Sequence, residues 1–198
     1  MVGPQGEPGS GGSSGFTHFL GEAFGGGIVF HLWLDPITGE EHGLVVCPDY
    51  FSGDWGYYGV QVNALSRTNG MSNLDSVRVI GVEPNTIWSV VDTLTYGGYS
   101  DWYIPAKHEA QMLANNALYV QNSLDLLGYP PFQSSQDSYY RHGGVRMWTS
   151  TAKPSSTNSA AWVWDPNDGF RGSSHTAASN FYWGFRDDSH SIFPIRRF

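Results

Sequence analysis

The fold of this chain is decided by the stretch Gly97-Gly98-Tyr99-Ser100-Asp101-Trp102-Tyr103-Ile104-Pro105-Ala106-Lys107-His108-Glu109. Gly97 and Gly98 can adopt a positive φ and stop a preceding helix. Residues 102–104 are of the aromatic and β-branched types that favour a half-buried strand. Pro105 ends that strand and can open a helix, because the first helical turn does not need its missing N–H. We therefore expect the rest of the chain to pack around this junction.

A helix is predicted on each side of this stretch. The helix before it has Asn85 or Thr86 as its natural N-cap, and its apolar residues follow the i, i+3, i+4, i+7 spacing of one helix face: Ile87, Val90, Val91 and Leu94. The helix after it starts from Pro105 and carries an apolar side formed by Ala110, Leu113, Ala117 and Val120. Ala106 has no side-chain oxygen, so it cannot form a full capping box with Glu109.

The remaining apolar runs are typical of short antiparallel strands. A hairpin is predicted around a turn at 35–39, and further strands complete the set: 28–34, 42–47, 147–150, 160–164, 181–185 and 192–198. The segments expected to be loops are 48–82 and 128–147. Two or three helices among short strands and long loops indicate an α+β fold, formed as a single globular domain over residues 16–198.

Two details of the predicted hairpin allow more than one interpretation. Gly25, Gly26 and Gly27 precede it without the Gly-Lys-Ser/Thr of a phosphate loop, so a close backbone approach or a bulge is expected there. His31 and His42 face each other across the hairpin either as metal ligands or as ordinary sheet residues. No third ligand is evident in the sequence, which favours the ordinary sheet position.

The charge is acidic and unevenly distributed. The chain has 10 Lys and Arg against 18 Asp and Glu, a net charge of −8. Residues 1–140 hold 14 acidic and three basic groups (−11), whereas residues 141–198 hold four acidic and seven basic groups (+3). The acidic total disfavours nucleic acid as a partner, while the basic surplus at the end of the chain suits an acidic ligand.

Neither a membrane span nor a disulfide is predicted. No apolar run approaches the roughly 18 to 20 residues that a membrane-spanning helix needs, so membrane insertion is not expected. The N-terminus lacks the basic-then-apolar pattern of a secretory signal. Cys47 is the only cysteine, which excludes a disulfide within the chain.

Glycine occupies every third position at the start of the chain, at residues 3, 6, 9, 12 and 15. A collagen triple helix demands this period, because only glycine fits at its axis. Residues 1–15 are therefore interpreted as a collagen-like remnant, with a flexible Gly/Ser linker as the alternative. Five triplets hardly hold a triple helix alone, so a homotrimer would be held mainly by the globular part.

Five motifs then follow one another in a fixed order: Phe24 to Phe30, His42 to Val45, Gly97 to Pro105, Trp148 to Thr151 and Pro194 to Phe198. In this order they resemble the C-terminal domain of the Legionella collagen-like protein, a collagen-like bacterial adhesin, and its relatives in many bacteria. The likeness covers about residues 17–198. More distantly, the domain is similar to C-type-lectin-like folds.

The resemblance implies a trimeric, extracellular domain that acts in cell adhesion. One member of the family binds sulfated glycosaminoglycans, which requires clustered cations, and this chain departs from that requirement by its net charge of −8. The expected partner is therefore a glycan or polysaccharide on a cell or matrix surface. A second hypothesis makes the domain the structural, trimerising tip of a fibre, such as a phage tail fibre or a bacterial appendage, located on a virion or a cell surface.

Calcium is the only cofactor that the sequence indicates. Asp165, Asn167 and Asp168 offer three oxygen-bearing side chains within four residues, as calcium sites require, but the same residue types are preferred in hairpin turns. Glu83-Pro84-Asn85 matches the tripeptide with which C-type lectins hold calcium and a sugar. It precedes a predicted helix here, so helix capping explains it better.

Aromatic side chains in the loops are candidates for stacking on sugar rings, and nearby arginines are candidates for binding hydroxyl or anionic groups. The predicted ligand-binding residues are Trp55, Tyr57, Tyr58, Tyr139, Tyr140, Arg141, Arg146 and Arg171. The alternative is that most of these aromatics belong to the core or to a subunit interface.

A catalytic function is not predicted. The sequence contains neither a nucleophile elbow nor the paired histidines of a metalloprotease helix. Asp187 and Asp188 beside His190 form either a hydrolytic cluster or, as we expect, the cap of a loop before the last strand. The protein is therefore interpreted as a carbohydrate-binding domain without enzymatic activity.

Overall fold

A computed structural model of the chain describes residues 15–130, 146–154, 157–164 and 181–198. Within these residues the helices are α1 (Gly70–Ile80), α2 (Ile87–Thr93), α3 (Lys107–Asn115) and α4 (Ala117–Leu127). The strands are β1 (Ala23–Phe24), β2 (Gly27–Leu34), β3 (Glu41–Val46), β4 (Phe51–Asp54), β5 (Met147–Ala152), β6 (Ala160–Trp164), β7 (Phe181–Phe185), β8 (Ser189–Ile192) and β9 (Ile195–Arg197).

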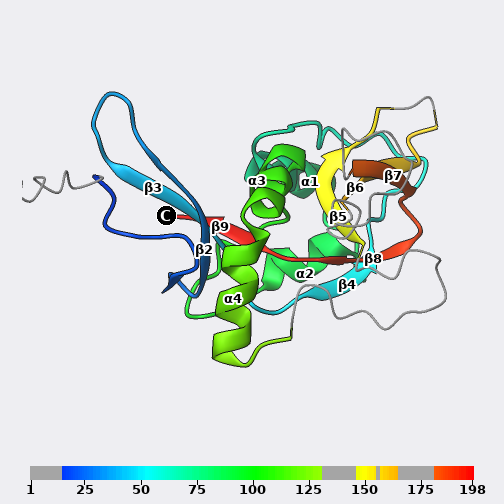
Figure 1. Cartoon of the computed structure of the whole chain (residues 1–198). Coiled ribbons are helices and arrows are strands. Elements are labelled where there is room, and N and C mark those ends of the chain that lie inside the picture. The colour runs from blue at the N-terminus through cyan, green and yellow to red at the C-terminus, as the bar shows by residue number, and fades with distance from the viewer. Residues whose placement is uncertain (1–14, 131–145, 155–156, 165–180) are drawn as a thin grey trace, which may run out of the picture.

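The strands form two separate sheets that lie at opposite ends of the molecule (Figure 1). One sheet has the order β1-β2-β3-β9, and the other has the order β4-β8-β5-β6-β7. All pairs are antiparallel except the single parallel contact between β5 and β8. The chain crosses from the second sheet to the first between β8 and β9. The predicted α+β fold is confirmed, while the likeness to C-type-lectin-like folds stays a prediction.

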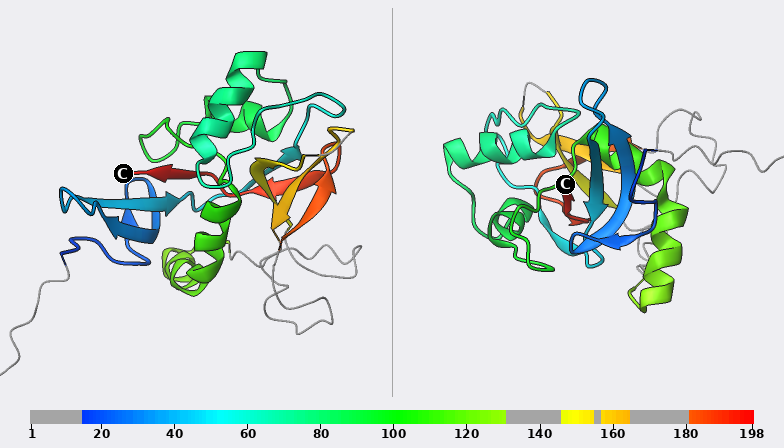
Figure 2. Two further views of the ribbon diagram at one scale, coloured as in Figure 1. Left: turned by 90° about the horizontal axis from the view of Figure 1, so that it is seen from above. Right: turned by 90° about the vertical axis from the view of Figure 1, so that its left-hand side faces the viewer.

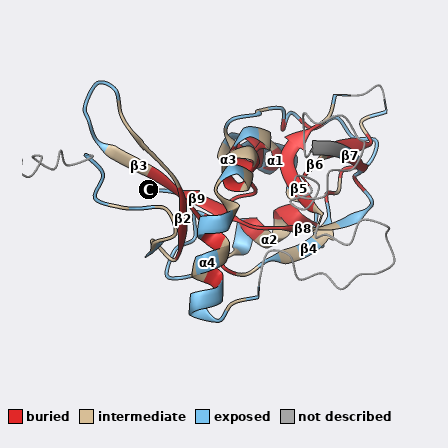
Figure 3. Ribbon diagram, in the orientation of Figure 1, coloured by how far each residue is buried: buried red, intermediate tan, exposed pale blue. Residues whose placement is uncertain are grey.

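The helices fill the space between the sheets, and α4 runs along one side of the molecule (Figure 2). The main core lies in this central region, where β9, β5 and α2 are buried (Figure 3). A smaller second core lies on the other face of the first sheet, around Val29, Val45, Cys47 and Trp102. The longest described helices, α1 and α4, have 11 residues each, which is too short to cross a bilayer.

The stretch from Trp102 to Pro105 is buried between the two sheets and bonds to both. Tyr103 exchanges two backbone hydrogen bonds of 2.9 Å with Ile195 of β9, and Pro105 O accepts a 2.9 Å bond from Ser150 N of β5. Trp102 Nε1 donates to Tyr96 O over 3.1 Å. The junction expected from the sequence is therefore the connection between the two sheets. The half-buried strand predicted there is wrong, because the stretch is fully buried and pairs only through the single bridge between Tyr103 and Ile195.

Two glycine turns meet beside this connection. Gly25 and Gly26 have φ values of 58° and 79°, and they reverse the chain between β1 and β2. Gly97 and Gly98, with φ values of 59° and 86°, close a second tight turn, in which Tyr96 and Tyr99 are hydrogen-bonded. A methyl group on Gly97 would lie 2.4 Å from Cα of Gly26. The close backbone approach predicted for the triple glycine is confirmed.

Arg196 of β9 holds both turns in place. Its guanidinium binds the Asp101 carboxylate through two bonds of 2.7 and 3.1 Å and donates to Gly25 O over 3.2 Å. It also lies 3.8 Å from the ring centroid of Tyr99. A single side chain from the last strand thus connects the first hairpin with the central stretch.

The helix predicted before the central stretch is confirmed as α2, with Thr86 as its N-cap. The helix predicted from Pro105 is wrong as one continuous element. It begins at Lys107, and it is interrupted at Asn116, whose φ and ψ of −112° and 14° are not helical. Instead, the Asn116 side chain donates from Nδ2 to Met112 O over 3.3 Å. Asparagine commonly forms such bonds to nearby backbone groups, and they compete with the regular helix.

The loop predicted over residues 48–82 is also wrong, since it contains β4 and the whole of α1. The helix is capped by Asn69, whose Oδ1 accepts from Ser72 N over 3.1 Å, and it buries Leu74 and Val77. The apolar pattern of α1 is short because Asn73, one residue before Leu74, occupies a buried position on the same face of the helix. The polar side chain conceals the helix period in the sequence.

The predicted hairpin is confirmed as β2 and β3. Asp35 closes its turn by accepting 2.8 Å bonds from the backbone N–H groups of Ile37 and Thr38, which lower the pKa of its carboxyl group. His31 and His42 do not face each other, because His31 pairs with Leu44 and His42 pairs with Trp33. Both imidazole rings pack against the Trp33 indole, with centroids 5.7 and 5.6 Å away. The metal-ligand interpretation of this pair is therefore wrong.

Candidate binding surface

Several predicted site residues lie outside the described residues, and so does the glycine-rich run up to residue 14. They are the stacking and anion-binding candidates Tyr139, Tyr140, Arg141 and Arg171, and the calcium candidates Asp165, Asn167 and Asp168. Within the described ranges, no group of three or more His, Cys, Asp or Glu side chains is arranged to hold a metal ion.

Trp55 and Tyr57 belong to the core and not to a binding surface. Trp55 is fully buried, its Nε1 donates to Thr149 O over 2.9 Å, and its ring packs edge-on against Trp88. Tyr57 is buried as well, and its hydroxyl donates to Gly81 O and accepts from Glu83 N. The stacking role predicted for these two residues is therefore wrong, because no sugar can reach either ring.

Tyr58 does lie on the surface, where the residue is 56% exposed. Its loop is held by Arg186, a buried residue directly after β7. The Arg186 guanidinium donates to Tyr57 O and Val60 O over 3.2 and 2.9 Å, and it lies 4.4 Å from the ring centroid of Trp55. Burial lowers the pKa of Arg186 to about 10. Because of these bonds, the exposed loop lies beside the end of β7.

The outer face of β6 and β7 presents a group of aromatic side chains next to this loop. Trp162 pairs directly with Trp183 across the two strands, so both indoles lie on the same face. Phe185, two residues further along β7, shares that face, and its ring packs edge-to-face against Trp183 at 5.4 Å. Trp183 and Phe185 are 47% and 46% exposed. We call Trp162, Trp183 and Phe185 the β6–β7 aromatic surface.

Two lysines flank this surface. Lys107 Nζ lies 3.7 Å from the ring centroid of Trp162, and Lys153 Nζ lies 4.3 Å from that of Trp183. Partial burial, together with the nearby charge of Arg67, lowers the pKa of Lys107. The surface thus combines flat apolar rings with ammonium groups, which can donate hydrogen bonds to hydroxyl or acidic oxygens.

Asp187 and Asp188 lie at the same end of β7 but do not form a hydrolytic cluster with His190. The Asp188 carboxylate accepts from Phe185 N over 3.2 Å and closes the turn between β7 and β8, as expected from the sequence. The His190 ring packs at a tilt against Trp148, with centroids 4.6 Å apart, and burial lowers the pKa of His190 to about 4. A buried, neutral imidazole that packs against an indole is structural.

Glu83-Pro84-Asn85 caps a helix, as the sequence favoured. Asn85 has a φ of 62°, which turns the chain into α2. Thr86 Oγ1 accepts from Ser89 N, while the Glu83 carboxylate is held by Tyr57 N over 2.7 Å. The carboxylate that a lectin would direct at calcium binds a backbone N–H here.

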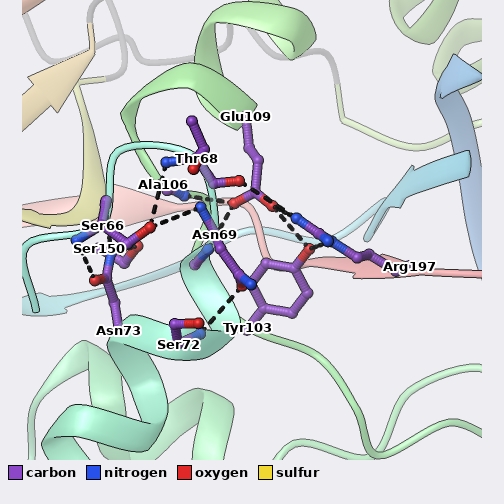
Figure 4. Close-up of polar contacts among 11 residues, drawn as sticks. Ser66, Thr68, Asn69, Ser72, Asn73, Tyr103, Ala106, Glu109, Ser150 and Arg197 are labelled. Atoms are coloured by element: carbon purple, nitrogen blue, oxygen red, sulfur yellow. Dashed lines mark hydrogen bonds and ion pairs between the residues drawn. The ribbon is translucent and has the colours of Figure 1, made fainter. Parts of the chain in front are cut away.

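The most buried carboxylate of the described residues, Glu109, is also structural (Figure 4). Its Oε2 accepts from Gly70 N and Ala106 N over 2.8 and 2.9 Å. Its Oε1 accepts from Tyr103 OH and from the Arg197 guanidinium over 3.1 and 2.8 Å. The Glu109 carboxylate thereby joins the N-terminal ends of α1 and α3 to β9. Its two oxygens accept these four hydrogen bonds, so neither oxygen is directed toward a substrate.

The sequence identified β6 and β7 as strands but not their aromatic surface. Trp183 and Phe185 alternate with residues that face inward, such as Gly184, and this period of two was visible in the sequence. It does not reveal which of the two faces is turned outward, because aromatic residues occupy both. Arg146, the remaining predicted residue, precedes β5 and is half-buried beside His190.

A different exposed apolar group lies on α4. Leu118, Tyr119, Leu126 and Leu127 are each more than half exposed, although the same helix buries Val120 and Leu124. We call these four exposed residues the α4 apolar face. The helix contains a single charged residue, Asp125.

Comparison with known proteins adds no assignment to these surfaces. No protein-family model matches the chain, and no curated protein matches it.

Proposed function

We propose that this chain is a non-enzymatic adhesion domain that recognises a glycan on a cell or matrix surface and is displayed outside the cell as a homotrimer. The ligand class is a glycan or polysaccharide, which binds through the β6–β7 aromatic surface. Residues of the extended loop around Tyr58 contribute at its border.

The observation that carries this proposal is the pair Trp183 and Phe185, two large aromatic side chains that stay about half exposed on a regular strand. Keeping such rings in water forgoes part of the roughly 1.5 to 3 kcal/mol that burial of a large apolar side chain contributes. A ligand that covers the rings recovers this energy. Sugar rings fit such a site, because their C–H faces are apolar and their hydroxyl groups remain available for polar contacts.

The lysines support the same ligand class. Lys107 and Lys153 place ammonium donors at the two indoles of the surface, while Asp187 offers an exposed carboxylate nearby. Donors and acceptors around an apolar centre are typical of small-ligand sites.

A glycan array probed with the purified full-length chain tests this proposal. We expect binding to a restricted set of glycans, measured with and without calcium. Binding only in the presence of calcium would direct attention to Asp165, Asn167 and Asp168 as its ligands. The absence of any binding across neutral and acidic glycans under both conditions would contradict the proposal.

The structural tip of a fibre is the second candidate function, and the α4 apolar face favours it, because an exposed apolar helix face suits assembly. Deleting residues 16–198 from the fibre distinguishes the two. Loss of assembly, with adhesion retained when the stem is trimerised artificially, indicates a structural role. Loss of adhesion under the same artificial trimerisation indicates recognition.

A further inference from the structure

We propose that Asn69 is a site of spontaneous deamidation, and that the Glu109 carboxylate suppresses the reaction while α1 stays packed on residues 103–106. Asn69-Gly70 is the only Asn-Gly pair in the chain. Glycine has no side chain to hinder the approach of its nitrogen to the preceding asparagine, and it rotates freely once its contacts are broken. Deamidation at this position depends neither on the glycan-binding function nor on an oligomeric state.

The reaction needs only water. The Gly70 backbone nitrogen loses its proton to hydroxide and attacks Asn69 Cγ, so that an N–Cγ bond forms and the Cγ–Nδ2 bond breaks. The side-chain nitrogen leaves as ammonia. Water then opens the resulting five-membered imide at one of its two carbonyl carbons. Attack at Cγ gives aspartate, whereas attack at the backbone carbonyl carbon of residue 69 gives isoaspartate.

The folded structure holds the two reacting atoms apart. Asn69 has a φ of −143° and a ψ of 99°. This ψ places the Gly70 nitrogen nearly opposite Cβ, whereas ring closure requires both atoms on the same side of the Cα–C bond. Asn69 Oδ1 meanwhile accepts from Ser72 N over 3.1 Å. The side chain is thus fixed as the N-cap of α1, away from the nucleophile.

Glu109 keeps the Gly70 nitrogen protonated. Its Oε2 accepts from Gly70 N over 2.8 Å, and a negative charge at that distance opposes the loss of the amide proton (Figure 4). Gly70 is also buried, and a methyl group built on it would overlap Ile104 O. The backbone at Gly70 therefore cannot rotate until α1 separates from residues 103–106. Because Asn69 itself is only half-buried, the position of the nucleophile controls the reaction, and not the access of water.

The two products differ in their effect on the fold. Aspartate is as good an N-cap as asparagine, and its charge suits the N-terminus of α1. Isoaspartate adds a methylene group to the backbone between residues 69 and 70, which displaces Gly70 N from Glu109. An opening of this junction that ends in isoaspartate is therefore permanent, because the bond between α1 and Glu109 cannot form again.

Peptide mapping of the full-length chain by mass spectrometry tests the site. Trypsin releases residues 68–78 as one peptide, and fragmentation distinguishes conversion at Asn69 from conversion at Asn73. In mildly alkaline buffer we expect Asn69 to be converted at least about tenfold faster in unfolding urea than under native conditions, because the rate follows the population of the open form. Asn69→Ser, which keeps an N-cap oxygen, should abolish the conversion of this peptide. Equal rates in the two buffers, or conversion confined to other asparagines, would overturn the proposal.

A comparison of Glu109→Gln with Gly97→Ala tests the role of the carboxylate. Gly97→Ala is the matched control, because it disturbs the contact with Gly26 and leaves the Glu109 carboxylate in place. At urea concentrations that give both variants the same global stability, we expect Asn69 to be converted at least about tenfold faster in Glu109→Gln, through local opening. Equal or slower conversion in Glu109→Gln would overturn the protective role of the carboxylate.

Hydrogen exchange of the wild type provides a measurement that does not require Glu109→Gln to fold. Exchange of the Gly70 amide and conversion of Asn69 both need the bond from Gly70 N to Glu109 to be broken. Below the unfolding transition, the two rates should therefore rise in parallel with the urea concentration. Conversion that proceeds independently of Gly70 exchange would overturn the inference.

Discussion

Gly97 and Gly26 contact each other through their backbones alone, since a methyl group built on Gly97 would lie 2.4 Å from Cα of Gly26. The two residues belong to different tight turns, and both have a positive φ. The contact lets the hairpin of β1 and β2 pack against the central stretch without any side chain between them. Glycine is required at this position for two reasons, the backbone conformation and the lack of space.

Replacing Gly97 by alanine is therefore expected to destabilise the protein by about 3 kcal/mol, from the left-handed conformation and the steric overlap together. The adjacent Gly98 separates the two effects, because it has a φ of 86° but open space around it. Gly98→Ala should cost only about 1 kcal/mol. Urea unfolding of both variants measures the difference, and equal losses would contradict the proposed backbone contact.

Glu109 is predicted to be essential for stability rather than for binding. Glu109→Gln removes the charge opposite Arg197 and directs an amide N–H₂ at donors, so we expect a loss of about 3 kcal/mol in the free energy of unfolding. Glu40→Gln, at an exposed turn position, is the control and should change stability by less than about 0.5 kcal/mol. Retained stability in Glu109→Gln, measured by urea unfolding, would show that the network in Figure 4 contributes little.

The stability of the protein should fall between about pH 6.5 and pH 4 because of His190. Burial against Trp148, outweighing the opposite effect of Asp188, lowers the pKa of His190 from 6.5 to about 4 in the folded state. The unfolded chain binds the proton first as the pH falls, so the folded state loses about 3 kcal/mol across this window and is fully stabilised above it.

Thermal unfolding of the wild type and His190→Gln from pH 7 to pH 4 measures this contribution. The variant should show a weaker dependence on pH, while His108→Gln, which replaces an exposed histidine, controls for the substitution itself. Identical pH profiles for the wild type and His190→Gln would assign the loss of stability to other groups.

The aromatic residues of β7 are predicted to carry the affinity for a glycan. Trp183→Ala should weaken binding about tenfold or more, because central aromatic side chains commonly contribute over 1 kcal/mol to an interface. Tyr50→Ala, which replaces an exposed aromatic residue packed on Phe193, should leave affinity unchanged. Calorimetry with a glycan found on the array gives both values. Equal affinities for Trp183→Ala and the wild type would move the binding site elsewhere.

The sequence predicted elements with a clear local pattern and failed where tertiary contacts decide. The hairpin around Asp35 and the helix capped by Thr86 were predictable, because their turn and cap residues act locally. The helix α1 was missed because Asn73 interrupts its apolar face, and this asparagine is tolerated only through its bonds to Ser66 and Ser150.

The candidate site was predictable only in part. Tyr58 was identified as an exposed aromatic residue, whereas Trp55 was assigned to the same surface although it is fully buried. Nothing in the local sequence distinguishes the two, because Trp55 is buried by residues far away in the chain, among them Trp88, Thr149 and Arg186. The same limitation applies to Trp183, whose exposure follows from its position near the edge of the second sheet.

The pairing of β3 with β9 has a consequence for how the protein recovers from denaturation. Val46 and Ile195 are neighbours in the first sheet although about 150 residues separate them, so this pairing forms late in folding. Until β9 arrives, the free edge of β3 is a template for strands of other molecules. Refolding yield should consequently depend on dilution, with crowded solutions giving cross-molecular aggregates in place of native protein.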